Sequence, residues 1–245
     1  MDNPMSLKGK RILITGASSG IGRAVAEVTA QLGAATVLVA RRADKLAEVR
    51  AGLPQSTKHL ICPGDVTDNM FLEELFETST RDGRLDGIVH AAGIGPTQPI
   101  GFSDPDFVED VYRTNALSFL QLMRLATRMK YRNRPYSVVA VSSIAALAGW
   151  SCVSTYAASK GAVSASVRAL AIELAPKGIR VNAVCPGHVK TPMLNPADEK
   201  VLADLQPLGI GSPKQIADVI AFLLSDAASF ITGVNLPVDG GYSAR

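Results

Sequence analysis

The sequence of 245 residues is poor in the residue types that build disulfide frameworks and metal sites. Its three cysteines, Cys62, Cys152 and Cys185, are odd in number and far apart, so we expect free thiols. The three histidines lack the spacing of metal ligands, and we expect no metal. A secreted disulfide scaffold and a metalloenzyme are therefore not what this chain predicts.

Charge of one sign and long apolar runs are scarce as well. Lys and Arg number 25 against 22 Asp and Glu, with no block of like charges, so nucleic-acid binding is not expected. The longest apolar stretch, Ala24 to Ala40, is interrupted by Glu27, Gln31 and Gly33, short of the roughly 18 residues of a membrane span. The first ten residues contain no apolar core of the secretory type, so we expect a cytoplasmic protein without membrane contact.

What the chain does contain is an alternation of short apolar runs and longer segments with helical spacing. The runs predict strands at 11–15, 36–40, 59–62, 87–90, 137–141, 180–184 and 234–238, and the segments between predict helices at 20–32, 43–51, 68–81, 104–130, 153–175 and 213–226. Strands without polar alternation are typical of parallel sheets covered on both faces. We therefore predict an α/β fold: a single doubly wound Rossmann-type domain over residues 1–245, with a seven-stranded parallel sheet and functional groups at its carboxyl edge.

A glycine-rich turn follows the first strand. Gly16, Gly20 and Gly22 permit a sharp turn, close approach of a pyrophosphate and tight helix packing, and the helix start offers free N–H groups to phosphates. Ser18 and Ser19 add hydroxyl donors beside Ile21. The motif predicts a dinucleotide site, with an ordinary strand-to-helix turn as the alternative.

The tips of the second and third strands bear on which dinucleotide binds. An acidic residue at the second tip favours NAD, but here Ala40 is followed by Arg41 and Arg42, whose guanidinium groups match a 2′-phosphate. This predicts NADP (NADPH) rather than NAD; the alternative is that both arginines belong to a plain surface loop. Asp65 and Val66 follow the third strand, in position to contact the adenine, or the aspartate caps a helix.

Three residues form a candidate catalytic group. Tyr156 and Lys160 are one helical turn apart, and Ser143 follows the fifth predicted strand at the carboxyl edge of the sheet. An ammonium beside a phenol favours the phenolate, so we expect the lysine to lower the pKa of Tyr156. Such a pair transfers a proton to or from an alcohol oxygen, which Ser143 holds in place.

With these motifs the chain resembles the short-chain dehydrogenase/reductase family from about Lys8 to Gly241. The resemblance implies that Asn115 holds a water behind the lysine, that Ser143, Tyr156 and Lys160 do the chemistry, and that Lys160 and Tyr156 also contact the cofactor. It adds further cofactor residues, which are Ala92, Gly93, Pro186, Gly187, Val189 and Thr191. One departure is His90-Ala91, where the family usually has two asparagines.

The resemblance implies an NADP-dependent oxidoreductase that interconverts a ketone and a secondary alcohol, most like 3-oxoacyl-(acyl-carrier-protein) reductases, with a substrate that is either free or linked to that carrier. An NAD-linked sugar or alcohol dehydrogenase and a non-catalytic dinucleotide-binding regulator are the alternatives. A short substrate lid is expected around 191–212. Relatives form tetramers through helices matching 104–130 and 153–175 and through the C-terminal strand near Asp239, Gly240 and Gly241, which implies a homotetramer. Residues near the catalytic positions that would wall the pocket are Ile94, Ala145, Trp150, Met193 and Leu194, with His188 close to the cofactor loop.

Overall fold

The computed structural model describes residues 3–195, 197 and 199–244. Their strands form one parallel sheet in the order β3-β2-β1-β4-β5-β6-β7. The strands are β1 (Arg11–Thr15), β2 (Ala35–Ala40), β3 (Leu60–Pro63), β4 (Leu85–His90), β5 (Arg132–Val141), β6 (Ile179–Pro186) and β7 (Asn235–Val238). The strand order reverses between β1 and β4, and this is where doubly wound sheets open a crevice for a ligand.

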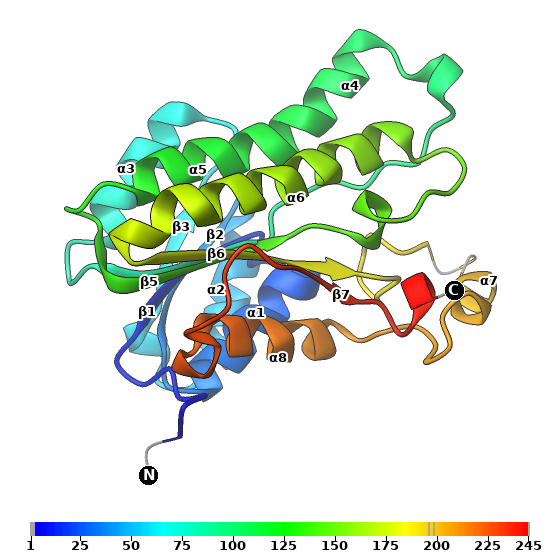
Figure 1. Ribbon diagram of the computed structural model, residues 1–245. Coiled ribbons are helices and arrows are strands. Elements are labelled where there is room, and N and C mark those ends of the chain that lie inside the picture. The colour runs from blue at the N-terminus through cyan, green and yellow to red at the C-terminus, as the bar shows by residue number, and fades with distance from the viewer. Residues whose placement is uncertain (1–2, 196, 198, 245) are drawn as a thin grey trace.

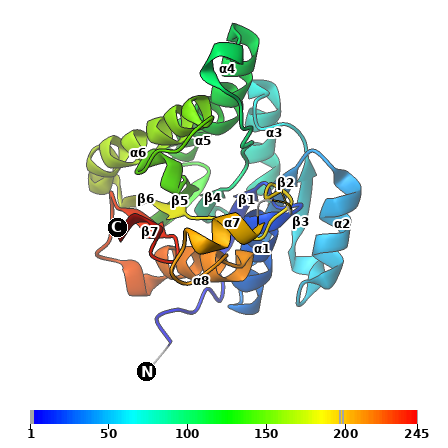
Figure 2. The same cartoon turned by 90° about the vertical axis from the view of Figure 1, so that its right-hand side faces the viewer.

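Helices cover both faces of this sheet (Figure 1). They are α1 (Gly20–Gln31), α2 (Ala43–Gly52), α3 (Asn69–Ser79), α4 (Pro105–Tyr112), α5 (Ser118–Ala126), α6 (Ser154–Leu174), α7 (Glu199–Asp204) and α8 (Pro213–Leu224). One apolar core joins the sheet to α3, α5 and α6, and a second joins it to α1, α2 and α8. The end-on view of Figure 2 shows the two helical layers with the sheet between them. The predicted doubly wound α/β fold is confirmed.

The predicted strands and all but one of the predicted helices are confirmed, with shifted ends. The predicted helix 104–130 is wrong as one element, because α4 and α5 are separated by the π-helical turn η3 (Arg113–Leu117). The predicted strand 137–141 begins five residues earlier, at Arg132, in a polar stretch that carries no strand pattern. Among the described residues, no helix combines the length and apolar character that a bilayer crossing requires.

The carboxyl ends of the strands all meet at one edge, because every strand pairing is parallel. The described part of the segment 191–212 contains α7, which Figure 1 places beyond the ends of β6 and β7. The predicted site residues follow these strand ends, so the topology gathers them on one side of the molecule.

Candidate active site

The turn between β1 and α1 forms an anion-binding cradle. Gly16 has φ +68°, and a Cβ there would lie 2.6 Å from the carbonyl oxygen of Ala91; one on Gly22 would lie 2.3 Å from the carbonyl oxygen of Gly16. Ser19 is the N-cap of α1 but makes no side-chain cap hydrogen bond, which leaves the first N–H groups of the helix available to a phosphate.

The loop after β6 faces this turn from the other side. A Cβ built on Gly20 would lie 3.3 Å from the methyl carbon of Thr191, so the two predicted cofactor segments meet across the sheet edge. Pro186 ends β6, Gly187 follows it, and Val189 forms an isolated bridge with Gly211. Free helix N–H groups on one side and a loop over the strand ends on the other fit a dinucleotide with a diphosphate.

The remaining cofactor predictions lie around the same edge. Arg41 and Arg42 are exposed after β2, and the Arg42 guanidinium lies 3.5 Å from the hydroxyl of Ser18 on the glycine turn. Val66 is buried, and the Asp65 carboxylate accepts 2.9 Å hydrogen bonds from the backbone and hydroxyl of Thr67. The predicted helix-cap alternative for Asp65 is wrong: Asp68, not Asp65, caps α3.

Ala92 and Gly93 follow β4, where the backbone passes close to the catalytic groups. The backbone N–H of Ala92 donates to the hydroxyl of Thr15 at 3.1 Å, which ties this loop to the end of β1. A Cβ on Gly93 would lie 3.0 Å from the Asn115 amide oxygen and 3.2 Å from the Lys160 ammonium. The absence of a side chain there leaves room for both groups.

Helix α6 and the end of β5 bring the catalytic candidates together. Ser143 follows β5 and caps the short helix η4 (Ile144–Ala146), while Tyr156 and Lys160 lie on the first turns of α6. The Lys160 ammonium is buried, lies 5.9 Å from the centre of the Tyr156 ring and donates a 2.9 Å hydrogen bond to the Val141 carbonyl. Its pKa falls to about 8, because burial disfavours the charged form.

The expectation that Lys160 lowers the pKa of Tyr156 is wrong for this arrangement. Burial raises the pKa of the phenol above its usual value, and a hydrogen bond with Ser143 only partly opposes the rise. The lysine directs its proton to Val141 and does not contribute to the shift. At neutral pH Tyr156 is therefore a protonated phenol, the form that donates a proton.

Asn115 lies at the centre of the π-helical turn η3 and is fully buried. Its amide oxygen accepts from the backbone N–H of Ile94 at 2.8 Å, and its amide nitrogen donates to the Ile94 carbonyl at 2.9 Å and to the Ser159 hydroxyl at 3.0 Å. These bonds fix the loop after β4 against α6. A π-turn of this kind is typical of functional sites.

His90, noted above as a departure from the usual asparagine, has a structural role that the sequence did not reveal. Its Nε2 atom lies 2.9 Å from the hydroxyl of Ser118, which donates at 2.6 Å to the Thr114 carbonyl. Burial and the charge of Lys160 lower the histidine pKa to about 3, so the ring is neutral. The neutral imidazole thus packs beneath η3 and supports the turn that carries Asn115.

The structure brings together three aromatic rings that no sequence motif connects. The centres of Trp150 and His188 lie 5.6 Å apart, and Tyr242 lies 6.1 Å from Trp150 and 5.8 Å from His188. Trp150 was predicted to wall the pocket and His188 was noted beside the cofactor loop. Tyr242 was missed, because it is distant in the chain and belongs to no motif.

In the part of the chain that the structure describes, no three His, Cys, Asp or Glu side chains gather as metal ligands would. The fold and the cradle fit a nicotinamide dinucleotide, and the group of buried Ser143, half-buried Tyr156 and buried Lys160 fits proton transfer at an oxygen. Together they define an oxidoreductase of the class that acts on CH–OH groups with a nicotinamide dinucleotide.

Comparison with known proteins gives the family. A family model described as "Enoyl-(Acyl carrier protein) reductase" matches residues 16–243. The chain is 38% identical to the cis-4-hydroxycyclohexanecarboxylate dehydrogenase of Sinomonas cyclohexanicum, over 95% of this chain and 96% of that protein. It is 35% identical to the 3-oxoacyl-(acyl-carrier-protein) reductase of Thermotoga maritima, over 97% of this chain and 99% of that one.

A solved structure of a short-chain type dehydrogenase/reductase from Mycobacterium marinum superimposes with a TM-score of 0.91 at 30% identity, covering 98% of each chain. The chain belongs to the short-chain dehydrogenase/reductase family. The family that the sequence motifs indicate is therefore confirmed.

Proposed function

We propose that the chain is an NADP-dependent oxidoreductase that interconverts a ketone and a secondary alcohol. The observation that carries the cofactor preference is the tip of β2, where exposed Arg41 and Arg42 follow Ala40 and no carboxylate stands at the strand end. The Arg42 guanidinium beside Ser18 places positive charge next to the glycine turn, where a 2′-phosphate would lie.

In this proposal each catalytic side chain has one task. A bound nicotinamide dinucleotide supplies or accepts the hydride. The Ser143 hydroxyl donates a hydrogen bond to the substrate oxygen, and the Tyr156 phenol gives that oxygen its proton. Lys160, held by Val141, keeps a positive charge beneath the site at neutral pH. The raised pKa of Tyr156 supports reduction, since that direction uses the protonated phenol.

The substrate class is narrowed by two relatives. One is named for a hydroxycyclohexanecarboxylate and another for a 3-oxoacyl group on a carrier protein. Both names describe an alcohol or ketone on a hydrocarbon frame, which in the first compound also bears a carboxylate. We propose a small carbonyl or alcohol substrate on a hydrocarbon frame, with segment 191–212 as its lid and with an acyl-carrier link as the narrower alternative.

The test is loss of NADPH absorbance with a panel of ketones. The wild-type protein is expected to turn over at least one ketone, to prefer NADPH to NADH, and to lose at least a hundredfold in rate on Tyr156→Phe, because the proton donor is removed. Preference for NADH would favour the NAD-linked alternative. Binding of NADPH with no turnover of any ketone would favour the non-catalytic regulator.

We also propose a homotetramer, with α5 and α6 at one interface. Exposed apolar side chains on these helices support it: Leu120 is 41% exposed and Ile172 is 79% exposed. Light scattering after size exclusion is expected to show four chains per particle, and a 25.7 kDa monomer would contradict the proposal. The cytoplasmic location expected from the sequence stays a prediction.

A further inference from the structure

The three aromatic rings described above converge from separate parts of the chain. Trp150 lies between η4 and α6, His188 follows β6, and Tyr242 begins the short helix η8 (Tyr242–Ala244). Their mutual angles of 58°, 70° and 80° are tilted or edge-to-face, which is the geometry that aromatic pairs favour. The three segments therefore form one rigid wall.

A pocket of about 400 Å³ lies against this wall. It is lined by Leu147, Ala148, Leu205, Tyr242 and Ser243, so Tyr242 belongs to both the wall and the pocket. Three of these side chains are aliphatic, and none is charged. A volume of this size falls at the low end of the range for small-molecule sites and accommodates a single ring with a substituent.

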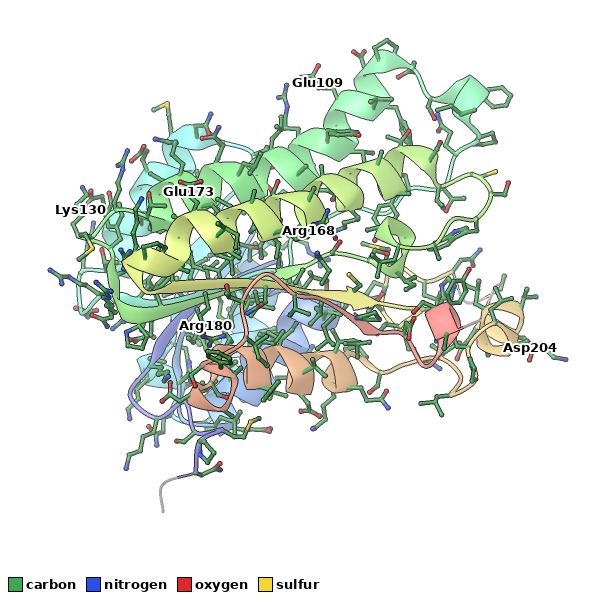
Figure 3. The ribbon with its side chains drawn as sticks, in the orientation of Figure 1. Glu109, Lys130, Arg168, Glu173, Arg180 and Asp204 are labelled. Atoms are coloured by element: carbon green, nitrogen blue, oxygen red, sulfur yellow. The ribbon has the colours of Figure 1, made fainter. Side chains whose placement is uncertain are left out.

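The pocket lies one short helix away from the catalytic serine. Leu147 ends the short helix that Ser143 begins, and His188 stands between Gly187 and Val189 in the loop predicted to pack on the nicotinamide. Leu205 comes directly after α7, and Figure 3 shows the neighbouring Asp204 beyond the ends of the strands. The pocket thus lies between the short helix that Ser143 caps and the chain that follows α7.

The position of His188 is fixed through its backbone. The amide of Gln206, itself 3% exposed, accepts from the His188 N–H and donates to the His188 carbonyl at 3.2 Å and to the Gly209 carbonyl at 2.7 Å. Burial lowers the pKa of the His188 ring, so the ring is neutral at pH 7. It therefore adds no charge to the aromatic wall behind Tyr242.

We propose, resting on the proposed function, that Tyr242, backed by Trp150 and His188, lines a specificity subsite for the uncharged, ring-shaped apolar part of a ketone whose carbonyl is held by Ser143 and Tyr156. An apolar ring gains by leaving water for this pocket. A carboxylate in the same place loses water without meeting a cation among the lining residues. The subsite therefore selects apolar cyclic ketones over charged ones of the same shape.

The chain supplies its own probe for this subsite, because Trp150 is its one tryptophan. The NADPH-loaded protein is titrated first with 4-tert-butylcyclohexanol and then, in a separate experiment, with 4-hydroxycyclohexanecarboxylate, which carries a charge on the same ring. Binding of each ligand is measured as a change in tryptophan emission. Because NADPH is the reduced cofactor, neither alcohol is consumed. We expect a saturable change in tryptophan emission with the first ligand and at least tenfold weaker binding of the second. Equal affinities would overturn the proposal.

Substitution separates the subsite from the reaction. For Tyr242→Ala we expect the ratio of kcat/KM for 4-tert-butylcyclohexanone to that for butanone to fall about tenfold or more, because only the larger ketone reaches the pocket. Tyr242→Phe keeps the ring and is expected to keep the ratio. Phe230→Ala removes a fully exposed ring elsewhere and is the matched control.

The two proposals fail in different ways. Saturable tryptophan emission without turnover of any ketone would reject the proposed reductase and leave the subsite standing. Turnover with an unchanged kcat/KM ratio in Tyr242→Ala would reject the subsite and leave the reductase standing.

Discussion

Asn115 and Ile94 exchange two hydrogen bonds, one of 2.8 Å into the amide oxygen and one of 2.9 Å from the amide nitrogen. A third bond, to Ser159, completes the amide's contacts on the side of α6. The side chain therefore joins the loop after β4, the π-turn and the catalytic helix. A change at this one residue acts on all three.

Asn115→Asp tests this junction. The carboxylate loses the two donated bonds and faces the Ile94 carbonyl in a fully buried place, so we expect a loss of about 2 kcal/mol in the free energy of unfolding. Ketone reduction is expected to fall at least tenfold. Urea unfolding and NADPH oxidation measure the two effects. Asn69→Asp, at an exposed position, is the control, and a similar loss there would contradict the explanation.

Gly93→Ala tests the space between two catalytic groups. The added methyl would lie 3.0 Å from the Asn115 oxygen and 3.2 Å from the Lys160 nitrogen, closer than most real contacts. We expect kcat to fall at least tenfold, because both groups must shift. Gly52→Ala, where a Cβ meets nothing within 4 Å, is expected to leave kcat within twofold. Comparable losses in the two variants would show that the crowding at Gly93 is not the cause.

Arg41→Ala tests the cofactor preference. If the guanidinium contacts the 2′-phosphate, its removal costs a charged hydrogen bond, and the KM for NADPH should rise roughly tenfold or more while that for NADH changes little. Steady-state kinetics with both cofactors gives the comparison. Lys45→Ala removes an exposed cation from α2, where it pairs with Glu48, and serves as the control. An equal rise for both cofactors would assign Arg41 a role other than phosphate recognition.

Lys160 makes the stability of the protein depend on pH. Its pKa is about 8 in the folded state against 10.5 for an ordinary lysine, so the unfolded chain binds more protons between these values. The buried lysine therefore lowers the free energy of unfolding where it must carry a proton, at pH 8 and below. This loss is relieved as the pH rises, and it is gone above pH 10.5. The whole effect is on the order of 3 kcal/mol.

Unfolding of the cofactor-free protein in urea at several pH values measures this contribution. Lys160→Met removes the titrating group, so the stability advantage of this variant over the wild type should shrink as the pH rises from 7 to 10. Lys177→Met, on the exposed turn η5 (Ala175–Lys177), should show no such trend. If the free energies of unfolding of Lys160→Met and the wild type differ by the same amount at every pH, the lowered pKa of Lys160 is not the cause of the pH dependence.

The sheet could be predicted from the sequence because its strands are buried on both faces. The runs at 11–15 and 36–40 contain little but apolar residues, and the observed β1 and β2 match them within one residue. The first five residues of β5, Arg132 to Tyr136, are mostly polar, so their pairing depends on neighbouring strands that periodicity does not show.

The same limit explains the π-turn. An extra residue in one helical turn leaves the apolar spacing of 104–130 nearly intact, so the sequence indicates one helix where the structure has α4, η3 and α5. Only the hydrogen bonds of Asn115 show why the turn is there.

The sequence predicts which residues form the candidate site, but it does not predict how their pKa values shift. Spacing places Tyr156 and Lys160 on one helix face, whereas the direction in which the ammonium points depends on the end of β5. The balance between burial and charge, which decides the pKa of Tyr156, follows from packing that the sequence alone does not give. Tyr242 joins Trp150 and His188 only through the folded chain.

The Gln206 amide binds the loop after β6 at His188 and the following chain at Gly209. The chain that follows α7 is thus tied back to the loop after β6, directly beside the aromatic wall. Since one buried amide sets both segments, a substitution at Gln206 would alter the position of His188 and of the chain after α7 together, and with them the outer boundary of the pocket.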